Sequence, residues 1–221
     1  MQQKNIGNLN CYVIENKDGD TPSGAVLLLH GYGADGRDLI SIADMWAERF
    51  RNLIFIAPDA PTQCEESPFG KQWFSLLNYD RDILNNEIKS TAPVMNELVN
   101  GINAEYGIPQ NKIVLSGFSQ GCMVALETAL YSQRPFCAVL GYSGMLLNSH
   151  SISQSKNKQT PIHLIHGTAD TVVPAAEWND ATKILEQHGF PVTGYKTKGL
   201  DHSIDFQGID SGLFFINEVF Q

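Results

Sequence analysis

The segment KIVLSGFSQGCMVAL, residues 112–126, sets a polar serine between two apolar runs. The first run predicts a strand buried on both faces, and the second predicts a helix. The central GFSQG, residues 117–121, therefore matches the G-x-S-x-G pattern in the strand-turn-helix context that the pattern requires. In such a turn the serine takes a positive φ that lifts its hydroxyl clear, and the glycines avoid collisions. The segment predicts a nucleophile at Ser119; a glycine-rich turn with an incidental serine is the alternative.

Further short apolar runs, most of them ended by glycine or proline, predict buried strands at residues 25–31, 53–58, 136–144 and 161–167. The stretches around them suit helices, at residues 36–50, 81–107, 120–132 and 175–189. Pro93 predicts a kink or break in the longest of these. Nearer the ends of the chain we expect an antiparallel edge strand at 10–16, a last strand at 192–198, and a helix at 211–220 capped by Asp210 or Ser211. The alternation predicts β-α-β units and a mostly parallel sheet with helices on both faces.

Two connections are unusual for a compact domain. Residues 58–80 are long for a loop and carry the exposed-looking aromatic residues Phe69, Trp73 and Phe74. Long loops of this kind are typical of lids and binding loops. Residues 148–160 are polar and predict a mobile surface loop.

Length and charge limit the classes of protein that the chain fits. Its 221 residues suit one domain, residues 1–221, with a substantial core. A formal charge of −9 disfavours nucleic acids and anionic membrane surfaces as partners. No apolar run approaches the ~20 residues that span a bilayer, and the first residues lack a signal-peptide core. We therefore expect a cytoplasmic protein.

The four cysteines are scattered along the chain, without a CxxC pair or an accompanying histidine cluster. This pattern disfavours a zinc site or a dense disulfide scaffold, so we expect reduced thiols and no metal. Cys122, three residues after Ser119, is a competing nucleophile in the sequence. Apolar packing in the helix is the more common role of a free cysteine at such a position.

A serine nucleophile needs a base, and the base needs an orienting acid. Open α/β sheets place such groups at the carboxyl ends of strands. Asp170 follows the predicted strand at 161–167, and His202 follows the last predicted strand. The order Ser119, Asp170, His202 is the order expected for this triad on an α/β-hydrolase sheet.

Other acids and histidines compete for these roles. Asp201 is adjacent to His202, where neighbouring side chains diverge, and Asp205 lies beyond the strand end at which the acid is wanted. The remaining histidines are predicted to be structural, inside a strand, at a helix end or in a polar loop: His30, His163, His166, His188 and His150. Placement along the chain therefore favours the pair Asp170 and His202.

An oxyanion site is expected where the glycine-rich loop within residues 27–38 meets the start of the helix after Ser119. The glycines let the loop backbone approach a substrate closely. By geometry the N–H groups of Tyr32 and Gln120 are the natural pair of donors. The alternative, a phosphate-binding loop, is disfavoured because neither GxxxxGKS/T nor GxGxxG occurs.

Six segments resemble, in order and spacing, the carboxylesterase/phospholipase family of α/β-hydrolases that includes the acyl-protein thioesterases: LLLHGYGADGRDL, FIAPDAPTQ, WF, GIPQNKIVLSGFSQG, LIHGTADTVVP and GLDHSI. The resemblance covers nearly the whole chain. It implies an α/β-hydrolase fold with a minimal cap domain or none, and the triad Ser119, Asp170 and His202.

The resemblance also implies roles for residues around the triad. The oxyanion donors it implies are Tyr32 and Gln120, and the acyl-channel residues are Trp73, Met145 and Val172. Three positions depart from the usual pattern of the family: Cys122 stands for a glycine, Tyr32 often for a leucine, and Met145 often for a tryptophan. These departures concern the acyl-chain preference rather than the triad.

We therefore expect a serine hydrolase that cleaves carboxylic esters or acyl thioesters through an acyl-enzyme on Ser119, without metal or organic cofactor. Lysophospholipase and acyl-protein thioesterase activities are alternatives within this class. A non-catalytic binding module, a peptidase and a lactone hydrolase are alternatives outside it. The expected partner is a small ester or thioester, a lipid or a lipidated protein. Residues 68–77 could contact a membrane, pack on their own domain, or form part of a homodimer contact.

Overall fold

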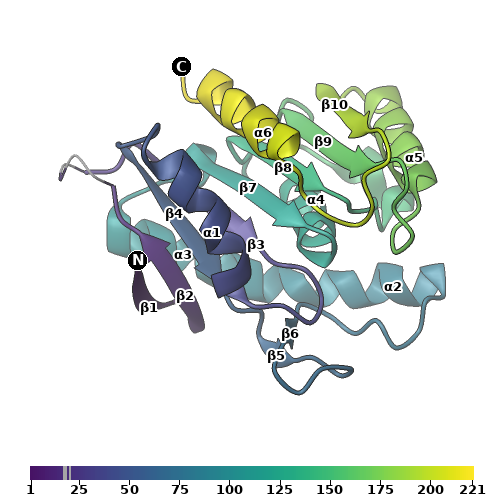
Figure 1. The fold of residues 1–221 in the computed structure, drawn as a ribbon, viewed down its shortest axis with the longest axis horizontal. Helices are drawn as coiled ribbons and strands as arrows, with labels where there is room; N and C mark the ends of the chain where they lie inside the picture. Colours follow the sequence, from purple (N-terminus) through teal and green to yellow (C-terminus); the bar gives the residue numbers. More distant parts are fainter. Residues whose placement is uncertain (17–18, 20) are drawn as a thin grey trace.

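The computed structural model describes residues 1–16, 19 and 21–221. These residues form one large sheet with the strand order β1-β2-β4-β3-β7-β8-β9-β10 (Figure 1). Its strands are β1 (Gln2–Ile6), β2 (Leu9–Ile14), β3 (Gly24–Leu29), β4 (Leu53–Pro58), β7 (Ile113–Phe118), β8 (Ala138–Tyr142), β9 (Ile162–Gly167) and β10 (Val192–Thr197). From β4 to β10 each neighbouring pair is parallel, while β1 and β2 form an antiparallel edge. The predicted mostly parallel sheet is confirmed.

Helices cover both faces of this sheet (Figure 1). Side chains of α1 (Gly36–Ala47) and α6 (Phe206–Val219) pack in one apolar core. Side chains of α2 (Arg81–Glu87), α3 (Thr91–Tyr106), α4 (Gln120–Tyr131) and α5 (Ala175–Gln187) pack in the other core. Within the described part of the chain, every helix is too short or too polar to cross a membrane.

Strand β3 illustrates why the parallel strands are apolar throughout. Val26 and Leu28 face the core of α1 and α6, whereas Leu27 and Leu29 face the core of α3 and α4. All four side chains are fully buried. A strand covered by helices on both faces needs apolar residues at every position, which is the pattern that the sequence shows.

Two boundaries differ from the sequence prediction. Strand β1 lies outside the predicted edge strand, and its polar sequence QQKNI pairs with β2 through the backbone. Helix α6 begins at Phe206 rather than at residue 211, because the side chain of Asp205 accepts a hydrogen bond from Gly208 N at 2.7 Å. Asp205 is therefore the N-cap, and the capping roles predicted for Asp210 and Ser211 are wrong.

Two further segments also differ from their predictions. The predicted break in the stretch 81–107 is present, but it lies at a 3-10 turn, Ile88–Ser90, and not at Pro93. Pro93 lies in the first turn of α3, where a missing N–H costs no helical bond. Residues 148–160 are not a loose loop, because Ile152 and Asn157 are buried. Asn157 Nδ2 donates to the carbonyl of Ser132 at 2.8 Å.

The connection 58–80 contains a small hairpin of β5 (Thr62–Gln63) and β6 (Lys71–Gln72), which projects from the body of the fold (Figure 1). Phe69 is 90% exposed, as expected, but Trp73 and Phe74 are each only 3% exposed. The side chain of Gln120 explains this burial, since it accepts from Trp73 N at 2.9 Å and donates to Phe74 O at 2.8 Å. The expectation that all three aromatic side chains are exposed is therefore corrected.

Helix α4 carries a buried carboxyl group, Glu127, which accepts a hydrogen bond from Asn148 Nδ2 at 3.1 Å. Burial raises the pKa of Glu127 to about 7, against the opposing effects of Asn148 and of the positive charge of Lys89. Between about pH 4.5, the ordinary pKa of a glutamate, and about pH 7, Glu127 therefore keeps a proton in the folded protein that it has released in the unfolded chain. Stability contributed by this proton is lost as the pH rises toward and through 7.

We predict that Glu127→Gln stabilises the protein at alkaline pH, because the amide never ionises. At pH 8 we expect the variant to unfold about 5 °C above the wild type, which corresponds to roughly 2 kcal/mol for a chain of this size. At pH 5 the difference should largely vanish. Thermal unfolding at both pH values checks this, with Glu186→Gln as a control at an exposed carboxylate. A difference of equal size at both pH values would contradict it.

Candidate active site

Ser119 lies on a tight turn between β7 and α4, with φ 53° and ψ −117°. Its backbone N–H donates to the carbonyl of Tyr142 in β8 at 2.9 Å, which ties the turn to the neighbouring strand. A Cβ on Gly117 would collide with the carbonyl of Gly121, and one on Gly121 would collide with the carbonyl of Leu29. The positive φ predicted for the serine is therefore present, and both flanking glycines are sterically required.

Asp170 and His202 meet beyond the carboxyl ends of β9 and β10. His202 Nδ1 donates to Asp170 Oδ2 at 2.8 Å, and the Asp170 side chain is completely buried. Its other oxygen accepts from the N–H groups of Val172 and Val173 at 2.9 and 2.8 Å. These contacts fix the carboxylate, and the carboxylate fixes the imidazole with Nδ1 protonated and Nε2 free to accept a proton.

Ser119 and His202 line the same cavity, which has a volume of about 400 Å³ and a mainly apolar wall. Three of the other predicted site residues, Tyr32, Met145 and Val172, also line it. Gly31 of the glycine-rich loop and Leu76 of the stretch 68–77 also line it, as do residues to which the sequence assigned no substrate contact: Ala34, Tyr79, Leu84, Phe118, Met123, Val173 and Pro174. A cavity of this size and character suits an apolar ligand group placed against the serine hydroxyl.

The expectation that Trp73 lines the cavity requires correction. Its indole N–H donates to the carbonyl of His30 at 3.0 Å, and its backbone N–H donates to the Gln120 side chain. Trp73 is therefore buried, and it is not among the residues that line the cavity. It supports the site from outside.

The competing acids are engaged elsewhere. One oxygen of Asp201 accepts from Thr171 N at 3.0 Å, from Thr171 Oγ1 at 3.1 Å and from His202 N at 2.9 Å. Asp205 caps α6. Of the three candidates, Asp170 is therefore the acid whose carboxylate holds the His202 ring, while Asp201 ties the backbone of His202 to the loop after β9.

His30 and His163 bond to the backbone or to hydroxyl groups rather than to a carboxylate. His30 Nδ1 donates to Gly31 O at 2.7 Å, its Nε2 accepts from Ala60 N at 3.0 Å, and burial lowers its pKa. His163 lies between the hydroxyls of Thr193 and Ser211. These contacts favour structural roles.

His166 was expected to be structural, and its Nε2 does donate to the carbonyl of Val173 at 2.8 Å. The same nitrogen lies 3.3 Å from Asp170 Oδ2. His166 therefore also supports the buried carboxylate, a contact that the strand-end HG motif did not reveal.

The backbone around Ser119 supplies N–H groups for an oxyanion. The N–H groups of Cys122 and Met123 bond to the carbonyl of Ser119, so the first turn of α4 is already paired from Cys122 onward. The N–H of Gln120 precedes them and has no acceptor within the helix, as holds for every first helical residue. Gln120 directly follows Ser119, and Tyr32 is among the residues that line the cavity.

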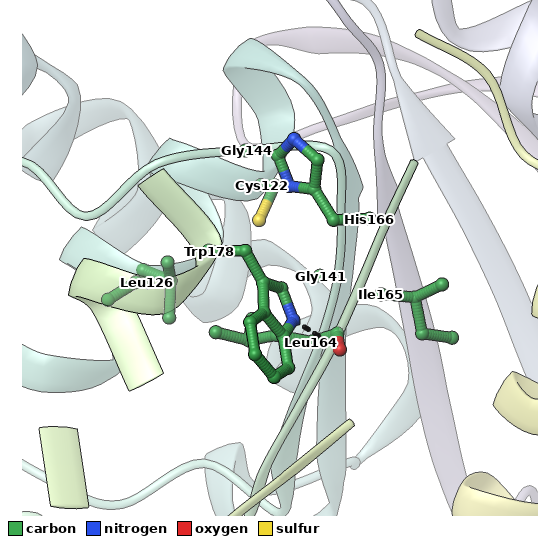
Figure 2. Close-up of a pocket in the computed structure, with 9 residues that line it drawn as sticks. Cys122, Leu126, Gly141, Gly144, Leu164, Ile165, His166 and Trp178 are labelled. Atoms are coloured by element: carbon green, nitrogen blue, oxygen red, sulfur yellow. Dashed lines mark hydrogen bonds between the residues drawn. The ribbon is translucent and has the colours of Figure 1, made fainter. Parts of the chain in front are cut away.

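Cys122 is not a competing nucleophile. It is 2% exposed, and burial raises the pKa of its thiol to about 12. Figure 2 shows its sulfur, the His166 ring and the Trp178 indole around a cavity of only about 10 Å³, which leaves no room for a substrate. The sulfur fits because Gly141 and Gly144 have no Cβ where it lies. Packing is therefore its role, as expected.

The sheet order, the strained serine turn after β7, and the aspartate-held histidine after the last strand together define an α/β-hydrolase fold. The expected fold class is confirmed.

Comparison with known proteins extends this to a family. Residues 9–220 match the model of the Phospholipase/Carboxylesterase family. The chain is 30% identical over 206 residues to acyl-protein thioesterase 1 of Yarrowia lipolytica, covering 87% of this chain and 90% of that protein. It is 28% identical to esterase YpfH of Escherichia coli over 195 residues, 88% and 82% of the two chains. The crystal structure of esterase PE8 superposes with a TM-score of 0.90 at 33% identity, covering 96% of this chain and 99% of that one.

The chain therefore belongs to the phospholipase/carboxylesterase family. It is an ester-hydrolysing enzyme of the serine hydrolase class.

Proposed function

We propose that the enzyme hydrolyses carboxylic esters and acyl thioesters at Ser119, with His202 as the base and Asp170 as the acid that orients it. One observation carries the proposal: an imidazole held through Nδ1 by a buried carboxylate lines the same apolar cavity as a serine on a strained turn. A non-catalytic binding module does not explain the imidazole held by a buried carboxylate, because an apolar ligand site needs no oriented base.

The mechanism is a two-step acyl transfer. His202 Nε2 takes the hydroxyl proton as Ser119 Oγ attacks the acyl carbonyl carbon, and the same nitrogen then protonates the leaving alcohol or thiol. Water, activated by His202, cleaves the resulting acyl-enzyme. The N–H groups of Tyr32 and Gln120 stabilise the negative oxygen in both steps, each contributing on the order of a hundredfold in rate.

The Gln120 side chain has a supporting role in this scheme. It is completely buried and spans the backbone of Trp73 and Phe74. Trp73 in turn bonds to the carbonyl of His30, two residues before Tyr32. This chain of contacts connects the start of α4 with the loop that supplies the second oxyanion donor, so that both N–H groups are held before substrate binds.

The acyl group of the substrate occupies the cavity beside Ser119. Met123, Met145 and Leu84 provide apolar wall, and Val172 lies at the exposed side with 65% of its surface accessible. Relatives named acyl-protein thioesterase and esterase support thioester as well as ester substrates. Lysophospholipids and lipidated proteins are the larger substrates that such a cavity would serve.

We also propose that lipid substrates reach the cavity over an apolar rim. We define this rim as Tyr79 and Val172, which line the cavity, together with Phe69 and Leu77 of the connection 58–80; all four are between 65% and 90% exposed. Flotation with zwitterionic vesicles tests whether the rim binds lipid. The Phe69→Asp variant should bind the vesicles more weakly than the wild type. Concentration-dependent dimers that are weakened by the same variant would assign the rim to a homodimer contact instead.

The four free thiols support a reducing, cytoplasmic location.

Hydrolysis assays test the proposed function. We expect the purified protein to hydrolyse p-nitrophenyl esters and acyl thioesters of graded chain length, with no added metal or cofactor. The absence of turnover for every ester and thioester in the series would contradict it.

A prediction concerns Asp201, whose single oxygen joins the His202 backbone to Thr171. Asp201→Ala removes these contacts, and we expect kcat to fall about tenfold because the imidazole is less well placed. Asp201→Asn keeps an oxygen that can accept the same hydrogen bonds, so it should retain most of the activity. Equal losses in the two variants would show that the charge of Asp201, not its hydrogen bonding, is what matters.

A further inference from the structure

Arg81, the first residue of α2, connects three walls of the cavity. Its Nη2 donates to the carbonyl of Leu146 at 2.8 Å, and its Nη1 lies 3.1 Å from the sulfur of Met145. The same Nη1 forms an ion pair with Glu177 Oε2 of α5 at 3.2 Å. One guanidinium thus contacts the loop after β8 and helix α5 while its own backbone belongs to α2.

Each of these segments carries a residue that lines the cavity. Leu84 belongs to α2, Met145 to the loop after β8, and Pro174 immediately precedes α5. Movement of any of the three segments away from the others would widen the cavity. The contacts of Arg81 join the first turns of α2 and α5 to the loop after β8, so they oppose such a movement.

The loop after β8 needs such support. Ser143 and Asn148, at its two ends, have positive φ values of 47° and 52°, which are uncommon for residues with a Cβ. At the far end the N–H of Asn148 donates to the Asn85 side chain at 2.7 Å. At the Met145 end the planar guanidinium of Arg81 contacts two consecutive residues, Met145 and Leu146, through its two terminal nitrogens. The single ammonium group of a lysine cannot reproduce this geometry.

We propose that Arg81 is a positioning residue that fixes the Met145 wall of the acyl cavity and so sets which acyl-chain lengths the enzyme prefers. The inference rests on the proposed function, because it assigns the cavity to the acyl group. The side chains of this ion pair are 45% exposed at Arg81 and 25% exposed at Glu177, so the pair by itself contributes little to stability. We therefore expect the loss of Arg81 to change the shape of the cavity rather than the stability of the fold.

The test measures kcat and KM for p-nitrophenyl acetate and octanoate with the wild type and four variants. In Arg81→Ala we expect KM for octanoate to rise at least about fivefold, with acetate changed less than about twofold, because a two-carbon group does not depend on the far wall. Arg81→Lys should behave like the alanine variant, since it loses the fork. Glu177→Gln should stay within about twofold of the wild type, because the contact with Leu146 remains.

Arg134→Ala serves as the control, at an exposed arginine before β8 and at the opposite end of that strand. Thermal unfolding of each variant identifies any loss of fold, and Arg81→Lys carries the test if the alanine variant is unstable. If the ratio of kcat/KM for octanoate to kcat/KM for acetate is the same in the Arg81 variants as in the wild type, the proposed role of Arg81 is wrong. This includes the case in which both esters lose activity equally. Absence of ester hydrolysis by the wild type would instead contradict the proposed function.

Discussion

Replacement of Ser119 by alanine is expected to lower kcat for ester hydrolysis at least about 10⁴-fold. The proposed mechanism has no acyl-enzyme without the Ser119 oxygen, and the thiol of Cys122, three residues further along the chain, is buried with its pKa raised to about 12. The fold should be unaffected, because the hydroxyl makes no capping bond to α4 and alanine meets the same backbone conformation. Initial rates with a short p-nitrophenyl ester measure the effect.

Thermal unfolding provides the control for this variant. We expect Ser119→Ala to unfold within about 2 °C of the wild type, as for a substitution that removes no packing group. A folded alanine variant with more than a few per cent of wild-type turnover would contradict the assignment of Ser119 as the nucleophile.

Asp170→Asn is expected to lower kcat about 10⁴-fold while preserving the fold. The N–H groups of Val172 and Val173 require an oxygen at the Oδ1 position, so the amide nitrogen must face His202. His202 Nδ1 would then have to accept rather than donate, and Nε2 would carry the proton. An imidazole in that tautomer cannot take the proton of Ser119.

Asp201→Asn is the matched control for Asp170→Asn, because Asp201 is the neighbouring carboxylate whose contacts an amide oxygen can keep. Steady-state kinetics of both variants should separate them by about four orders of magnitude, because Asp170→Asn is expected to lose about 10⁴-fold and Asp201→Asn to keep most of its activity. Comparable activity in the two would show that the Asp170 carboxylate does not orient the base.

The features that sequence reasoning predicted well are those set by local pattern. The GFSQG turn needs small residues at fixed offsets, and the glycines at 117 and 121 have no room for a Cβ. Asp170 could be preferred over Asp205 because parallel strands place active groups at their carboxyl ends, and β9 ends three residues before Asp170. It could be preferred over Asp201 because the side chains of adjacent residues, here Asp201 and His202, diverge.

The features that were missed depend on contacts between distant parts of the chain. Burial of Trp73 depends on the side chain of Gln120, which is 47 residues away. Arg81 reaches Leu146 and Glu177 across 65 and 96 residues. No periodicity or local motif records such contacts.

Helix boundaries and edge strands were missed for a different reason. Asp205, Asp210 and Ser211 are all residue types that cap helices, so composition does not select among them. Strand β1 has no apolar alternation and is held by its backbone pairing with β2. Such choices are made by tertiary packing rather than by propensity.

Covalent labelling with a fluorophosphonate tests the central claim most directly, because only an activated serine reacts with this group. After digestion and mass spectrometry, we expect one phosphonylated peptide carrying the adduct on Ser119 in the wild type, and strongly slowed labelling in Asp170→Asn. An unlabelled wild-type protein, or an adduct on any other residue, would contradict the account.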